Sequence, residues 1–197
     1  MRISLFFLLF ASFATAQQSS PPASGTQAIY QAEARSAQHK FDYVQQNARR
    51  STPDTRPTIL TENEINAWLS SGQAQLPQGV KRLQVHGSSG VINATATVDF
   101  DEITAAHRSS NPLLSLFTGT HQVEAQAHAQ AMGGEGQVHI DSVSLDGVEI
   151  PHMALEYFVE HYIQPKHPDI GLDSTFKLSY KIDTATVGSR QLAITQK

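Results

Sequence analysis

The chain of 197 residues carries 14 Lys and Arg against 18 Asp and Glu, a formal net charge of −4, and contains no cysteine. This weak negative charge argues against a nucleic-acid partner, because nucleic acids are bound through a clustered basic face. The absence of cysteine excludes a disulfide framework, a thiolate-based site and a lipid-modified N-terminal cysteine. The length and the 40% content of hydrophobic residues are ordinary for one soluble domain.

Residues 1–16 have the three parts of a secretory signal peptide. Arg2 supplies the positive charge, a mostly apolar run from Ile3 to Phe13 follows, and Ala14-Thr15-Ala16 is a small-residue cleavage site. The apolar run is shorter than the about 20 residues that span a bilayer, which favours export and cleavage near Ala16 over a membrane anchor. We therefore predict a periplasmic or secreted protein, with a flexible Ser- and Pro-rich linker over 17–25 and a single domain over 26–197.

Three helices are predicted in chain order. Apolar residues at spacings of three and four predict the first over about 27–49. Thr61 and Glu64 have the spacing of a capping box and predict a second helix, which ends near Ser71-Gly72. The third follows Pro151 and runs to about Ile163, with one apolar stripe. The segment 111–117 is expected to be a short apolar helix or turn. The stripe consists of Leu155, Phe158, Val159 and Tyr162.

The rest of the chain has the period-two alternation of strands. Two strands are expected on either side of a loop at 86–90, the second running from Ile92 to Phe100. A long strand over 121–131 turns at Gly133-Gly134 into another over 138–145, whose alternation breaks and predicts a bulge near Asp141-Ser142. Two further strands follow from Phe176. The predicted fold is α+β, a long curved antiparallel sheet packed against two or three helices.

One face of the long strand is formed almost entirely by alanine. Because alanine is a poor strand former, its repetition suggests that a second body approaches the sheet closely. That body is either an acyl chain or the first or third helix, and the sequence leaves both open. If it is a ligand, the apolar groove is formed by twelve residues: Ala94, Ala96, Val98, Phe100, Val123, Ala125, Ala127, Ala129, Leu155, Phe158, Val159 and Tyr162.

Few residues suggest catalysis or metal binding. His152, Glu156 and Glu160 lie at four-residue steps on the third helix and could share a metal, but a solvated helix edge explains them better. His121, His128 and His139 are interpreted as surface histidines. The chain has no Gly-x-Ser-x-Gly elbow, and the glycines at 133–136 lack the lysine of a phosphate loop. We predict no catalytic residue, no metal and no cofactor.

Several of these segments together resemble a known group of proteins. They are Thr61 to Asn66 with Leu69, then Leu76 to Val80, and Ile150-Pro151 before a helix. Their order resembles the YpmS-like and LmeA-like groups of small bacterial envelope proteins. The resemblance implies a curved antiparallel sheet with an apolar groove, related to tubular lipid-binding domains, and a role in binding phospholipid or assembling envelope glycolipid. It transfers no catalytic residue.

The functional hypothesis is an exported envelope protein that binds a lipid or another apolar ligand without catalysis. The alternative is an envelope scaffold that binds another protein, for example by adding a strand to an exposed sheet edge. An enzyme with a site in the same groove is the least favoured.

Overall fold

The computed structural model describes residues 25–104 and 116–197. The predicted signal peptide, the linker up to residue 24, and residues 111–115 of the expected apolar helix or turn lie outside this part. Within the described residues, no helix combines the length and the apolar character that crossing a membrane requires.

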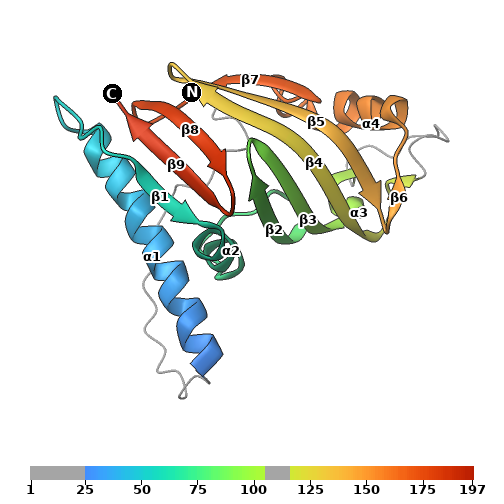
Figure 1. The fold of residues 1–197 in the computed structure, drawn as a ribbon. Coiled ribbons are helices and arrows are strands. Elements are labelled where there is room, and N and C mark those ends of the chain that lie inside the picture. The colour runs from blue at the N-terminus through green and yellow to red at the C-terminus, as the bar shows by residue number, and fades with distance from the viewer. Residues whose placement is uncertain (1–24, 105–115) are drawn as a thin grey trace.

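Nine strands form one sheet in which every pairing is antiparallel. Its order is β1-β9-β8-β4-β3-β2, and β5 lies on the other side of β4 with β6 and β7 beside it (Figure 1). This sheet and its helices confirm the predicted α+β class. The strands are β1 (Thr58–Thr61), β2 (Val80–Ser88), β3 (Val91–Asp99), β4 (Thr120–Met132), β5 (Glu135–Leu145), β6 (Val148–Glu149), β7 (Asp173–Lys177), β8 (Ile182–Gly188) and β9 (Gln191–Gln196).

The described helices lie mainly at the two ends of the sheet. Figure 1 shows α1 beside β1 at one end and α4, which follows β6 in the chain, at the other. All three predicted helices are present, the third as an α-helix followed by one π-helical stretch. The helices are α1 (Gly25–Ala48), α2 (Glu62–Ser70), α3 (Phe100–Thr104), α4 (His152–Phe158) and the π-helix η2 (Val159–Ile163).

The start of α2 has the predicted capping box. The Glu64 backbone N–H donates to the Thr61 hydroxyl, and the Thr61 backbone N–H donates to the Glu64 carboxylate at 2.7 Å. Lys40 and Ser36 on α1 donate to the same carboxylate, each at 2.6 Å. Burial of the carboxylate opposes these bonds, yet together they hold the pKa of Glu64 below its usual value. Glu64 therefore completes the capping box of α2 and also joins α2 to α1.

Long strand β4 alternates as its sequence predicts. Its even-numbered residues from Thr120 to Met132 are exposed, and its odd-numbered residues are half-buried or buried. The predicted bulge is also present, because Gln126 pairs with Ser142 while Ala127 pairs with Ile140. Asp141 is the extra residue, and it moves Val143 and Leu145 onto the apolar face.

Three predictions about strands were wrong. The expected loop at 86–90 is only a two-residue turn, because Ser89 and Gly90 have φ of 46° and 86° and let the strands pair up to Ser88 and Val91. Phe100 begins α3 and does not end β3. The C-terminal region holds three strands, since β7 starts at Asp173 and pairs with β5. The structure also has a strand that the sequence analysis did not predict, β1 over Thr58–Thr61, which pairs with β9.

The core is divided into two hydrophobic clusters on one face of the sheet. The α4 cluster consists of Val98, Phe100, Phe117, Leu145, Ile150, Ala154, Leu155, Phe158 and Tyr162. The α1 cluster consists of Ala37, Val44, Leu60, Trp68, Leu69, Ala74, Ile182 and Ile194. Register pairs from Ala131 through Ala185 to Ile194 place the α1 cluster on the alanine face, and the pairing of Val123 with Leu145 places the α4 cluster on the same face.

Candidate functional site

The structure divides the twelve predicted groove residues into two groups. Five of them belong to the α4 cluster, and Ala96 and Val123 pack against it. Val159 is half-buried in η2. The third helix therefore covers this end of the face, which is the alternative that the sequence left open. The five are Val98, Phe100, Leu155, Phe158 and Tyr162.

Aromatic rings close the α4 end of the face. The Phe158 ring stacks on Phe117 with 4.2 Å between centroids and meets Phe100 edge-on at 5.6 Å. The Tyr162 ring lies 5.2 Å from Phe158. Such ring pairs stabilise a core beyond the apolar area that they bury. This end is hydrophobic core.

The other four predicted residues form what we term the alanine strip: Ala94, Ala125, Ala127 and Ala129. Ala94 is the register partner of Ala125, so the strip crosses β3 and β4. No member belongs to either cluster or to the half-buried hydrophobic side chains packed against one among the described residues. Ala127 is 6% exposed, and the other three are half-buried. The strip is thus a low apolar surface between two cores, flanked by Val138 of β5.

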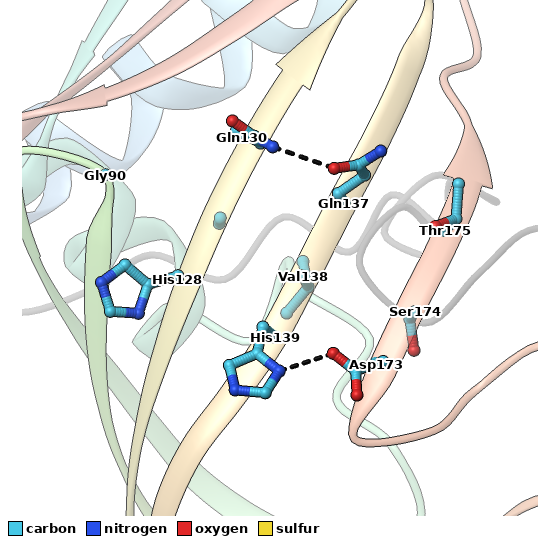
Figure 2. Close-up of a pocket in the computed structure, with 10 residues that line it drawn as sticks. Gly90, His128, Gln130, Gln137, Val138, His139, Asp173, Ser174 and Thr175 are labelled. Atoms are coloured by element: carbon cyan, nitrogen blue, oxygen red, sulfur yellow. Dashed lines mark hydrogen bonds and ion pairs between the residues drawn. The ribbon is translucent and has the colours of Figure 1, made fainter.

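The opposite face of β4 and its neighbours carries a depression of about 580 Å³. We term it the polar hollow, and Figure 2 shows its lining. Exposed polar side chains come from β4, β5 and β7. The lining residues are Gly90, His128, Ala129, Gln130, Gln137, Val138, His139, Asp173, Ser174 and Thr175.

Two histidines in the hollow are oriented by carboxylates. His128 and His139 are register partners on β4 and β5. His128 Nδ1 lies 2.8 Å from Asp141, and His139 Nδ1 lies 2.5 Å from Asp173. The hydrogen bond to Asp173 raises the pKa of His139. The sequence analysis treated these histidines as surface residues and did not predict the hollow. The reason is that strand β7, which supplies Asp173, was not predicted at that position.

His121 is oriented in the same way at the other end of β4. Its Nδ1 lies 2.6 Å from Asp146, and its Nε2 lies 2.7 Å from the carbonyl oxygen of Thr118. Both partners accept hydrogen bonds, so the ring satisfies both only when both nitrogens carry a proton. These bonds raise the pKa of His121 and, from the other side, lower the pKa of Asp146. The contact fixes the β5–β6 turn against β4.

The candidate metal ligands on the third helix do not converge. His152 Nδ1 lies 3.5 Å from Glu156 as an ion pair along α4, and both side chains are exposed. Within residues 25–104 and 116–197, no group of three or more His, Asp or Glu side chains is placed to hold a metal ion. Among the described residues, the alanine strip and the polar hollow are the two candidate surfaces for ligand binding.

These two surfaces must be interpreted from their own geometry. The resemblance to the YpmS-like and LmeA-like groups stays a prediction, and so does the export that the N-terminal segment indicates. Comparison with known proteins finds no match to this chain among protein-family models, curated proteins or solved structures.

Proposed function

We propose that this is an exported, non-catalytic binding protein that holds a lipid acyl chain, or a similarly slender apolar group, against the alanine strip. The observation that carries the proposal is the position of the strip. It lies between two hydrophobic clusters, each with its own helices, and no strip residue belongs to either cluster. A narrow apolar ligand placed there would connect the two cores.

The dimensions of the strip suit such a ligand. Ala125 and Ala129 are four residues apart on one strand, a separation of about 14 Å. The half-buried neighbours Ile140 and Val143 on β5 pack against the α4 cluster, so they would form one wall of the path. Leu83 and Val85 on β2 pack against the α1 cluster and would form the other. Alanine methyl groups between these walls leave a low floor.

The energy of binding limits which ligand fits. Each buried methylene contributes about 0.8 kcal/mol, so ten methylenes would contribute about 8 kcal/mol. Association costs at least about 4 kcal/mol in lost freedom of movement. A short fatty acid should therefore bind weakly, whereas a long acyl chain should bind well enough to remain through purification.

The first test is to purify the full chain from the envelope of its own host and measure bound lipid by native mass spectrometry and solvent extraction. A co-purifying acyl lipid at a stoichiometric level is expected. The second test measures binding of cis-parinaric acid, a fluorescent acyl-chain probe, to variants. Ala125→Phe and Ala129→Phe fill the strip and should weaken probe binding at least about tenfold, because a ring replaces the ligand.

The matched control is Gln126→Phe, which places the same ring on the exposed face of the same strand. It should bind the probe as the unmodified protein does. All three variants must retain the circular dichroism spectrum of the parent. The proposal is refuted if the native protein carries no lipid and binds no probe, or if the control loses as much binding as the strip variants.

A further inference from the structure

The polar hollow lies on a face of the sheet that the two core clusters leave open. Both clusters lie on the alanine face, whereas the side chains of His128 and Gln130 lie on the other face of β4. Gln137 and His139 on β5 and Asp173 and Thr175 on β7 are likewise exposed. Solvent therefore reaches a depression lined by side chains of three adjacent strands.

Two carboxamides in the hollow hold each other in fixed planes. Gln130 Nε2 donates to Gln137 Oε1 at 2.9 Å, as Figure 2 shows. This bond leaves the Gln130 carbonyl oxygen as an acceptor and the Gln137 amide hydrogens as donors. A fixed donor and a fixed acceptor side by side match a ligand that both donates and accepts, and a hydroxyl group does both.

The two histidines add further fixed polar atoms. His128 and His139 each direct Nδ1 at a carboxylate, so in each ring Nε2 is the nitrogen left for another partner. His139 Nε2 is 3.9 Å from Asp141, beyond hydrogen-bond distance. The orienting carboxylates thus leave two imidazole nitrogens beside the carboxamide pair.

The charges in the hollow do not suit a strongly charged ligand. Each imidazole is paired with one aspartate, so protonated histidines would be balanced by Asp141 and Asp173. Among the described lining residues there is no Lys or Arg to bind a phosphate and no Trp, Tyr or Phe to anchor a protein partner. The lining instead consists of two carboxamides, two imidazoles, one carboxylate and two hydroxyl residues, together with Gly90, Ala129 and Val138.

We propose that the polar hollow binds a neutral, polyhydroxylated ligand, a glycan chain, which lies across β4, β5 and β7 and hydrogen-bonds to Gln130, Gln137 and the two imidazoles. The side chains that would bind the glycan lie on the opposite face of β4 from those of the alanine strip, although Ala129 and Val138 line the hollow as well. Either can be present without the other. Binding is weak for a single sugar unit, since each neutral hydrogen bond replaces one to water.

The test uses the full chain and three neutral oligosaccharides as probes: maltohexaose, cellohexaose and chitohexaose. Binding is measured by calorimetry and by changes in amide chemical shifts. At least one of the three should bind, with shifts concentrated on β4, β5 and β7. The double variant Gln130→Ala/Gln137→Ala should weaken that binding at least about fivefold, because it removes the fixed donor and acceptor.

The matched control is Gln126→Ala, an exposed glutamine on the same face of β4 that is not among the lining residues. It should leave the affinity unchanged, and thermal unfolding should show that both variants are folded. The inference is overturned if none of the three probes binds at millimolar concentration, or if the control weakens binding as much as the double variant. Loss of binding on adding EDTA would also overturn it, because a bridging cation would then be required.

Discussion

A buried pair of carboxamides should be among the most sensitive points of the fold. Asn47, in the last turn of α1, is 1% exposed, and Gln196, at the end of β9, is 4% exposed. Asn47 Nδ2 donates to Gln196 Oε1 and to the Asp54 carbonyl oxygen, both at 2.8 Å. Its Oδ1 accepts from the Asp54 N–H at 2.8 Å. One side chain thus joins α1 to the following loop and to the C-terminal strand.

Replacing Asn47 with Leu keeps the branched shape of the side chain and removes these three bonds. Gln196 Oε1 would lose its partner in a buried position, which costs about 1–3 kcal/mol. The Asp54 groups are half-buried, so water can replace part of their bonding. The total expected loss in the free energy of unfolding is about 2–4 kcal/mol. For a chain of this length, that corresponds to a fall in Tm of about 4–16 °C.

The assay is urea unfolding followed by circular dichroism, with Gln46→Leu as the control. Gln46 is the neighbouring exposed residue on the same helix, and its replacement should change the stability by less than about 0.5 kcal/mol. The double variant Asn47→Leu/Gln196→Leu should lose less than the sum of the single losses, because each single change already breaks the hydrogen bond between the two carboxamides. A loss below about 0.5 kcal/mol for Asn47→Leu, or strictly additive losses, would refute this reasoning.

Two further outcomes follow from the structure. Gly79→Ala should lower the free energy of unfolding by about 2 kcal/mol or more in the same urea assay, because Gly79 has φ of 86° and a Cβ there would lie 2.6 Å from the Asp99 carbonyl oxygen. An unchanged midpoint would show that the backbone relaxes. The Asp173 bond raises the pKa of His139, so its contribution to stability is complete below about pH 6.5 and is lost as the pH rises through the raised value. The stability difference between the parent and Asp173→Asn should therefore shrink above that pH, and a difference that grows instead would contradict the assignment.

Much of the fold could be predicted because its signals are local. The period of two along β4 determines which residues share a face, and the broken period between Ile140 and Val143 reveals the bulge. The capping box at Thr61 and Glu64 depends on a spacing of three residues. In contrast, β1 and β7 are short, and their strand character comes from pairing with β9 and β5, which are distant in sequence.

The candidate site could be predicted only in part, for a related reason. Alternation correctly placed Ala94 and Ala125 on the apolar face of the sheet, and the helical stripe correctly placed Phe158 on a buried helix face. Neither pattern carries information on which helix covers which length of a sheet. That depends on where the chain leaves β5 and β6, since α4 begins directly after Pro151. As a result, Phe158 belongs to the α4 cluster, while the alanines of the strip belong to neither cluster. The polar hollow is formed partly by β7, a strand that the sequence did not predict. Its lining could therefore not be predicted from the sequence.

Both proposed sites depend on the same property of β4. A shift of one residue in its pairing would move every alanine to the solvent face and every glutamine to the core. The bulge at Asp141 prevents this conflict further along β5, because without the extra residue Ser142 and Ser144 would face the α4 cluster in place of Val143 and Leu145. It also leaves Asp141 exposed beside His128, where it orients the imidazole. One inserted residue thus completes the apolar core on one face of the sheet. On the other face it supplies the carboxylate that orients His128 of the polar hollow.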